Sequence, residues 1–111
     1  MEKELNFDKI SQLEQRSDEL AQFFRALSDP TRIKILFLIS DKEMCVSQVA
    51  DLLHMTEGAV SHQFRVLRMN KLVKRTRRGK ELCYRLNDSH MDRIMSLGRA
   101  IVNLYTRSFT D

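Results

Sequence analysis

The sequence has few residues that break helices, few cysteines and no long apolar run. It holds three glycines, one proline, two cysteines and no tryptophan in 111 residues. Because glycine and proline are the strongest breakers of regular structure, their scarcity predicts a mostly helical chain. No apolar run approaches the roughly 20 residues that span a bilayer, and the N-terminal MEKELNFDK lacks the apolar core of a signal peptide. We therefore expect a cytoplasmic protein.

The two cysteines, Cys45 and Cys83, are not spaced as a Cys-x-x-Cys pair or as a zinc knuckle. In a reducing compartment, isolated cysteines of this kind are usually small, half-buried thiols. Cys83 lies in a predicted strand, where we do not expect a partner for Cys45. The sequence thus predicts two free thiols.

The overall composition is that of a folded chain. Hydrophobic residues make up 42% of the sequence and charged residues 31%, which is typical of a globular domain rather than a disordered segment. There is no internal repeat, low-complexity tract or linker. A chain of this length holds one core, so we expect residues 1–111 to form a single domain.

Positive charge is concentrated in one part of the chain. Residues 62–85 contain nine lysines and arginines and one acidic residue. Residues 1–61 contain seven lysines and arginines and eleven acidic residues. The net charge of +4 therefore understates how basic one region is. A focused basic surface of this kind favours contact with the phosphates of a nucleic acid.

Apolar spacing predicts four helices, a hairpin and a final helix. Asp29 is the expected N-cap of the second helix, and Pro30 suits its first position. The wide apolar stripe of the last helix predicts a subunit interface. The predicted elements are a helix at about 10–27, a buried central helix starting at 30, a helix-turn-helix at about 46–69, a wing at about 72–86 and a helix at about 89–106.

Four segments resemble the ArsR/SmtB family of winged-helix repressors. They are ALSDPTRIKIL (26–36), GAVSHQFRVLRMNKLVK (58–74), RRGKELCYRL (77–86) and NDSH (87–90). The resemblance runs from about residue 20 to 100, in the family's order and spacing. It implies a mainly α winged helix-turn-helix (α-α-α-α-β-β-α) and a homodimer formed by the first and last helices. It also implies a transcriptional repressor that binds an inverted-repeat DNA operator and is released by an inducer, most often a metal ion.

The predicted DNA contacts lie on the second helix of the helix-turn-helix and on the wing. Ser61 and His62 match the family's Ser-His pair and are expected to reach base edges or phosphates. Glu57 and Gly58 stand where zinc-sensing relatives usually have Gln and Ser, so the preferred bases are expected to differ. The wing cations are expected to neutralise phosphates. The full predicted set is Thr56, Glu57, Gly58, Ser61, His62, Arg65, Arg68, Arg75, Arg77, Arg78 and Lys80.

Asp88 and His90 match the start of the family's last-helix metal site, which implies a divalent inducer such as zinc or nickel. The family takes two further ligands thirteen and sixteen residues after the aspartate, where this chain has Ile101 and Leu104. Neither side chain binds a metal, and a tight zinc site takes three or four protein ligands. The sequence thus keeps half of the site. The alternative is that Asp88 or Ser89 only caps the last helix.

Other signals and other classes of protein remain as alternatives. Cys45 supplies one thiol of the Cys-x-Cys that the family's thiolate sensors place before the helix-turn-helix, so a redox role for Cys45 stays open. A regulator that senses another non-metal signal, or none, is also open. A helical protein-interaction module with an incidental basic patch is the alternative from another class. The sequence has no nucleophile elbow, glycine-rich phosphate loop or HExxH motif, and we expect no enzyme.

Overall fold

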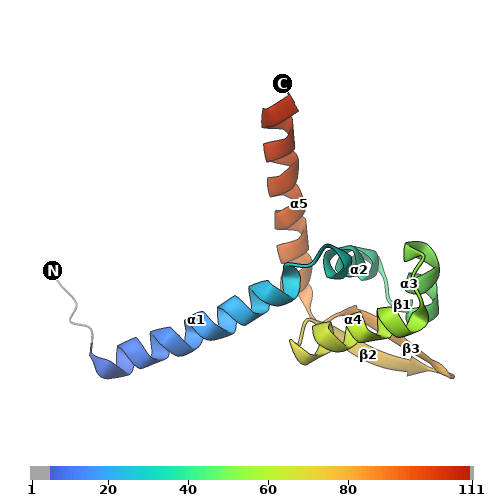
Figure 1. Cartoon of the computed structure of the whole chain (residues 1–111), viewed down its shortest axis with the longest axis horizontal. Helices are drawn as coiled ribbons and strands as arrows, with labels where there is room; N and C mark the ends of the chain where they lie inside the picture. Colours follow the sequence, from blue (N-terminus) through green and yellow to red (C-terminus); the bar gives the residue numbers. More distant parts are fainter. Residues whose placement is uncertain (1–5, 111) are drawn as a thin grey trace.

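The computed structural model describes residues 6–110, and for His90 and residues 105–110 it describes the backbone alone. A compact body carries two long helices that project from it in different directions (Figure 1). The expected winged helix-turn-helix order is confirmed, with one addition, the short strand β1. The elements are α1 (Phe7–Leu27), α2 (Pro30–Asp41), β1 (Met44–Cys45), α3 (Val46–Leu53), α4 (Glu57–Met69), β2 (Val73–Arg78), β3 (Glu81–Leu86) and α5 (Ser89–Thr110).

Helix α2 lies at the centre of the body, which here means residues 30–86. Its start is as predicted, because the Asp29 carboxylate accepts a hydrogen bond from the backbone N–H of Arg32 at 3.0 Å and Pro30 takes the first position. Ile35 and Leu36 are completely buried. The nearly continuous apolar sequence of α2 therefore reflects a helix with protein on most sides.

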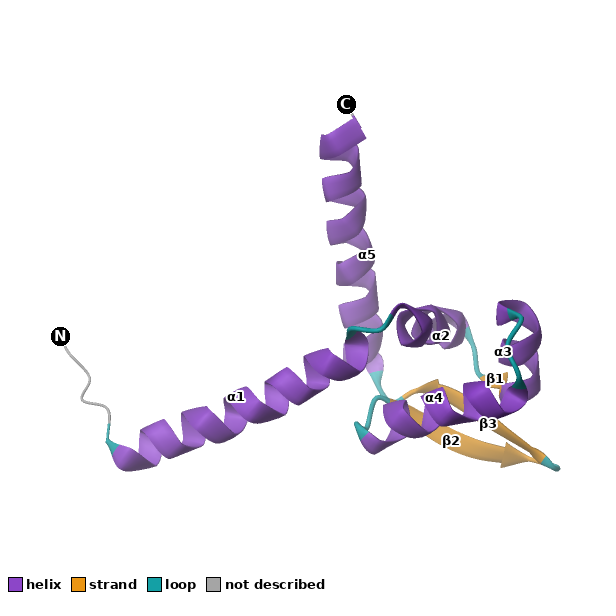
Figure 2. Ribbon diagram, viewed as in Figure 1, coloured by secondary structure: helices purple, strands orange, loops and turns teal. Residues whose placement is uncertain are grey.

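Strands β2 and β3 form the predicted hairpin, called the wing below, and β1 pairs with the other edge of β3. The sheet is antiparallel with the order β1-β3-β2 (Figure 2). The register places Tyr84 opposite Arg75 and Met44, and Cys83 opposite Thr76 and Cys45. The Tyr84 ring stacks on Phe64 of α4, with ring centroids 3.9 Å apart. One face of the wing thus packs against α4.

The two projecting helices, α1 and α5, are called the arms. In α1 only Ala26 is buried, and the apolar side chains further out are exposed. In α5 Met91 and Met95 reach the core, and the apolar residues between positions 97 and 104 are exposed. Up to residue 104, the exposed large apolar residues of the arms are Phe7, Ile10, Leu13, Leu20, Phe24, Ile94, Leu97, Ile101, Val102 and Leu104. Despite this apolar surface, no helix within residues 6–110 is long and apolar enough to cross a membrane.

Arg32 connects the end of α1 with the body. Its guanidinium donates to the carbonyl oxygens of Ala26, at 2.6 Å, and Arg25, at 3.2 Å, which are among the last carbonyls of α1. It also donates to the side-chain oxygen of Gln63 on α4, at 3.3 Å. Helix C-termini leave several carbonyls without partners inside the helix, and a guanidinium has five donors to satisfy them. One side chain therefore joins α1, α2 and α4.

Candidate nucleic-acid interface

A tight turn sets the angle between α3 and α4. His54 adopts a left-handed conformation with φ of 56°, and its backbone N–H closes the end of α3 on the carbonyls of Ala50 and Asp51. The hydroxyl of Thr56 then accepts from the N–H of Ala59 at 3.1 Å and starts α4. Thr56 was predicted as a DNA contact, and in this structure its hydroxyl caps the helix.

Helix α4 has a buried face and an exposed polar face. Val60, Phe64 and Leu67 are completely buried at i, i+4 and i+7, which fixes the rotation of the helix about its axis. The polar residues predicted to face DNA lie off this stripe. Glu57, Gly58, His62, Arg65 and Arg68 are exposed, and Ser61 is half-buried.

The wing carries its arginines on two different faces. Arg75 is paired with Tyr84 and Arg77 with Leu82, so these two arginines share the face of the hairpin that packs on α4. Both are exposed. Gly79 supplies the positive φ of 66° that the tip requires, and Lys80 follows it in the turn. The exposed side of α4 and the Arg75–Arg77 row are therefore neighbours.

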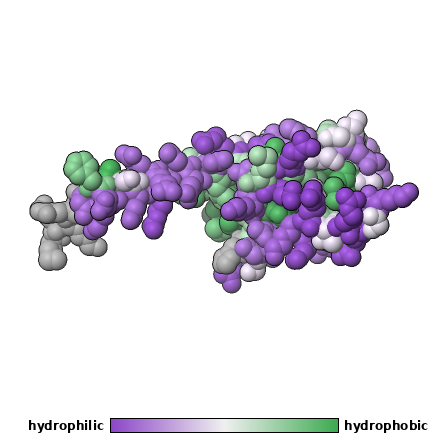
Figure 3. Space-filling model, turned by 90° about the horizontal axis from the view of Figure 1, so that it is seen from below, coloured by the Kyte–Doolittle hydropathy of each residue, from purple (hydrophilic) through white to green (hydrophobic). Residues whose placement is uncertain are grey.

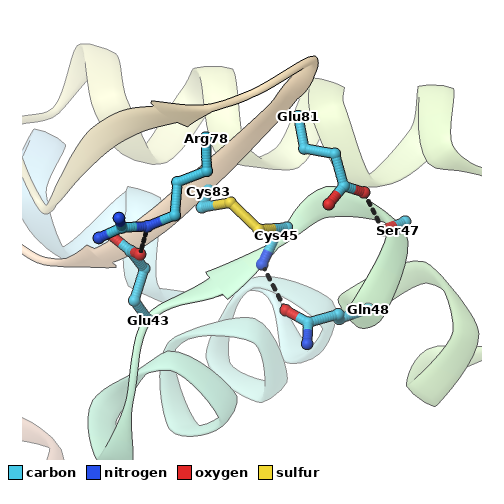
Figure 4. The surroundings of a disulfide bond; sticks show 7 residues. All are labelled: Glu43, Cys45, Ser47, Gln48, Arg78, Glu81 and Cys83. Carbon is cyan, nitrogen blue, oxygen red and sulfur yellow. Dashed lines mark hydrogen bonds and ion pairs between the residues drawn. A yellow bond between two sulfur atoms is a disulfide. The ribbon is translucent and has the colours of Figure 1, made fainter.

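Arg78 differs from the other wing arginines because it already has an anionic partner. Its guanidinium forms an ion pair and a hydrogen bond with the Glu43 carboxylate, on the residue before β1 (Figure 4). The hydrogen bond from Arg78 lowers the pKa of Glu43 below its ordinary value, and the same contact raises the pKa of Arg78. The predicted role of Arg78 as a phosphate contact thus competes with this pair.

Three cationic residues that were not predicted as contacts, Lys71, Lys74 and Arg85, lie beside α4 together with Arg68 and Arg75. An open hollow between the end of α4 and the wing is lined by Arg68, Lys71, Val73, Lys74, Arg75, Thr76, Arg85 and Asn87. Five of these eight residues are basic. Lys71 is held in place because its carbonyl accepts from the Asn87 amide at 2.8 Å. The hollow extends the basic surface from the wing to the end of α4. In the view from below, hydrophilic side chains cover most of the body (Figure 3).

The two cysteines are joined by a disulfide, and the prediction of two free thiols is wrong. Cys45 on β1 lies directly opposite Cys83 on β3, with 3.7 Å between their Cα atoms (Figure 4). Strand β1 has only two residues, too short to show the alternating pattern by which strands are recognised. The pairing with β3 brings together residues 38 positions apart.

The structure describes only part of the predicted metal half-site. The Asp88 carboxylate accepts from the backbone N–H of Met91 at 3.3 Å, as the capping alternative expects. The side chain of His90 lies outside the described residues. Ile101 and Leu104 are exposed and apolar. Among the described residues, no group of three or more His, Cys, Asp or Glu side chains could hold a metal ion. The described donor set therefore does not fit a complete zinc or nickel site.

Sequence reasoning missed Arg32, Gln63 and Glu43, each of which positions part of this interface. Arg32 lies three residues after the capping Asp29, in the first turn of α2, where a side chain is ordinarily expected to be exposed to solvent. Gln63 and Glu43 have their partners 31 and 35 residues away along the chain. No local pattern marks such contacts, because hydrophobic periodicity describes only neighbouring turns of one element.

Comparison with known proteins agrees with this geometry. Residues 29–75 match the family model described as bacterial regulatory protein, arsR family. A transcriptional repressor SmtB homolog of Synechocystis sp. is 38% identical over 88 residues, which cover 79% of this chain and 64% of that protein, just under two thirds of its length. A cadmium resistance transcriptional regulatory protein CadC homolog of Staphylococcus aureus is 33% identical over 95 residues, covering 85% of this chain and 78% of that protein.

Among solved structures, the fold is similar to a homodimeric winged helix-turn-helix DNA-binding domain, Mb0332 of Mycobacterium bovis. The TM-score is 0.77 at 24% identity, covering 92% of this chain and 91% of that one. A family model over the helix-turn-helix, and relatives above 30% identity over most of the chain, agree with the fold. The chain therefore belongs to the ArsR family of bacterial regulatory proteins.

Proposed function

We propose that the chain is a cytoplasmic, sequence-specific DNA-binding repressor of transcription that binds an inverted-repeat operator as a homodimer. The single observation that carries the proposal is the arrangement of α4 beside a basic wing. The buried stripe of Val60, Phe64 and Leu67 turns a polar helix face outward, next to exposed Arg75 and Arg77. A helix of this size fits the major groove, and adjacent cations neutralise backbone phosphates. Membership of a family of regulatory proteins supports a non-enzymatic role.

Roles within the interface follow from position and chemistry. We assign base reading to Ser61 and His62, with Glu57 and Gly58 modifying the preferred bases at the start of α4. Arg65 and Arg68 extend the contact along the helix. The wing residues Arg75, Arg77, Arg78 and Lys80 are assigned to phosphates, which fix register without reading sequence. Thr56 acts by starting the helix.

The homodimer is assigned to the arms. Large apolar side chains are exposed along both α1 and α5, and exposed apolar surface of this kind marks protein interaction sites. Between α5 and the body an open apolar groove of about 320 Å³ continues this surface, with Leu27, Phe37 and Ile94 among its lining residues. A two-fold dimer would present two α4 helices to two half-sites, as an inverted repeat requires.

The proposal is tested with a labelled duplex from the promoter region of the protein's own gene, read by fluorescence anisotropy. We expect binding about a thousandfold tighter than to a duplex with scrambled half-sites, and log K that falls linearly with log salt concentration. His62→Ala should lower affinity for the operator and leave the scrambled duplex unaffected. Equal affinity for both duplexes, or none for either, would contradict the proposal.

For the inducer, two classes are compared in the same assay. A divalent metal is the first, because a curated relative is named for cadmium resistance; Asp88 and His90 are the residues it would use. The described residues supply no complete metal site. A metal inducer would be established if zinc, nickel, cobalt or cadmium released the protein from its operator and Asp88→Ala abolished that release. A thiol signal is the second class, favoured by the Cys45–Cys83 bond.

A further inference from the structure

Three contacts join the wing to the segment that begins the helix-turn-helix. The disulfide links Cys45 to Cys83, the Glu43 carboxylate pairs with Arg78, and the Ser47 hydroxyl donates to Glu81 (Figure 4). Residues 43, 45 and 47 surround the start of α3, and their three partners all lie at the outer end of the wing. This junction therefore ties the outer part of the wing to the start of α3, while the Phe64–Tyr84 stack holds the inner part on α4.

The two sulfur atoms of the junction have unequal access to solvent. Cys83 is completely buried, whereas Cys45 is half-buried. Cys45 is also the N-cap residue of α3, and its backbone N–H is held by the side-chain oxygen of Gln48 at 2.9 Å. The unpaired N–H groups at a helix start stabilise a thiolate. In the reduced chain, Cys45 is thus the thiol that reacts first and Cys83 the one that resolves the product.

We propose that Cys45 and Cys83 form a reversible thiol–disulfide site that takes a hydroperoxide, and that bridging them tightens DNA binding. The Cys45 thiolate attacks the peroxide, forming an S–O bond as the O–O bond breaks, and the leaving oxygen departs as water or alcohol after taking a proton. The Cys83 thiol then gives up its proton and attacks the Cys45 sulfur. The S–S bond forms, the S–O bond breaks, and hydroxide leaves with the Cys83 proton as water. Two thiols are oxidised by two electrons and one peroxide is reduced.

The effect on DNA binding follows from how little else holds β1 to β3. Two non-bonded sulfur atoms need van der Waals separation, so reduction moves Cys45 away from Cys83. Only the pairs Met44–Tyr84 and Cys45–Cys83 join β1 to the sheet. The Arg78–Glu43 ion pair and the Ser47–Glu81 hydrogen bond both lie at the surface, where such contacts contribute little. The reduced wing therefore has more freedom, and it loses more conformational entropy when DNA fixes it.

This inference rests on the proposed DNA-binding function, and one assay separates the two. Operator affinity is measured by anisotropy for protein reduced with dithiothreitol and for protein treated with hydrogen peroxide, with free thiols counted by alkylation and mass spectrometry. We expect zero free thiols after peroxide, two after reduction, and roughly threefold to tenfold tighter binding by the bridged form. If neither form binds the operator, the proposed function fails. If both bind with equal affinity, only this inference fails.

Cys45→Ser is the matched variant, because it removes the bond without placing a hydroxyl in the buried position. It should bind like the reduced wild type and show no response to peroxide, and Cys83→Ala should behave alike. A peroxide response that persists in Cys45→Ser would assign the effect to another group, such as one of the six methionines, and would overturn the proposal. Two further results would also overturn the proposal: weaker DNA binding by the bridged form than by the reduced form, and a disulfide that dithiothreitol reduces only after the protein has unfolded.

Discussion

The body and the arms of this molecule are built on opposite principles. Of the side chains that the structure describes, all those that are completely buried lie in the body, residues 30–86, among them Ile35, Phe64 and Cys83. Along α1 only Ala26 is buried, while Leu13, Leu20 and Phe24 remain more than half exposed. The body is closed around a core that the inner ends of the arms complete through Ala26, Met91 and Met95. Further out, the arms present apolar surface that the single chain does not cover.

The difference shows how two tasks are divided within 111 residues. Reading DNA requires side chains held in fixed positions, and a core packed on α2 provides that rigidity. Association requires apolar surface that is left free, and the arms provide it. Changes in the body should therefore alter folding at any protein concentration. Changes on the arms should alter association.

The largest effect is expected for Phe64→Ala. Phe64 is completely buried and stacks on Tyr84, so its removal leaves a cavity where α4 meets the wing. We expect a loss of about 3–5 kcal/mol in the free energy of unfolding, measured by chemical denaturation at several protein concentrations. Phe24→Ala on α1 is the control, since its ring does not belong to the body's core. A Phe64→Ala protein as stable as the wild type would contradict the assignment of folding stability to the body and of association to the arms.

Ile101→Asp should weaken association through the arms. It places a charge within the exposed apolar stripe of α5, and burying that charge in a dimer carries a large desolvation penalty. We expect the dimer dissociation constant to rise by about a hundredfold, near 2.7 kcal/mol, in analytical ultracentrifugation. Ser96→Asp, on the opposite side of the same helix, is the control. Dimers that persist in Ile101→Asp would exclude this stripe from the interface.

Within the body, Arg77→Ala and Arg78→Ala should differ although the residues are neighbours. Arg77 has no acidic partner in the described part of the chain, while Arg78 pairs with Glu43. We expect Arg77→Ala to weaken binding to operator and scrambled duplexes alike, by roughly tenfold, and to reduce the salt slope by about 0.9 for each subunit of the dimer. Arg78→Ala should have a smaller effect on both quantities. Equal losses would show that the Glu43 pair does not restrain Arg78.

The smallest effect is expected for Glu43→Gln, which leaves Arg78 without its carboxylate. Operator binding should tighten by roughly threefold with a steeper salt slope, because one more cation faces the phosphates. The ion pair also makes stability depend on pH. Since the pKa of Glu43 is lowered in the folded chain from an ordinary value of 4.5, the pair's contribution is present above that value and is lost as pH falls through the folded-state pKa. Glu43→Gln should remove that part of the acid dependence of unfolding.

Local signals in the sequence were enough for most of the fold. Asp29 before Pro30 located the start of α2, and the spacing of Val60, Phe64 and Leu67 located the buried side of α4. These signals work because capping and helical periodicity depend on residues a few positions apart. The same periodicity separated the exposed residues of α4 from its core.

The junction at β1 could not be predicted in the same way. Met44 and Cys45 are two residues without an alternating pattern, and their pairing with β3 depends on how the whole body closes. Cys83 was placed correctly in a wing strand, yet its partner was missed because β1 was not foreseen. The Glu43–Arg78 pair depends on the same closure. Contacts between distant segments are set by tertiary packing, which local periodicity does not contain.

The bonds of Arg32 give the dimer a direct mechanical connection to the DNA-reading helix. Its guanidinium holds the last carbonyls of α1 and the Gln63 side chain of α4 at once. A rotation of α1 against a partner subunit therefore pulls on α4 through a single rigid, planar group. A signal that turns α1 would thus reach the reading helix through this contact, without a ligand touching α4.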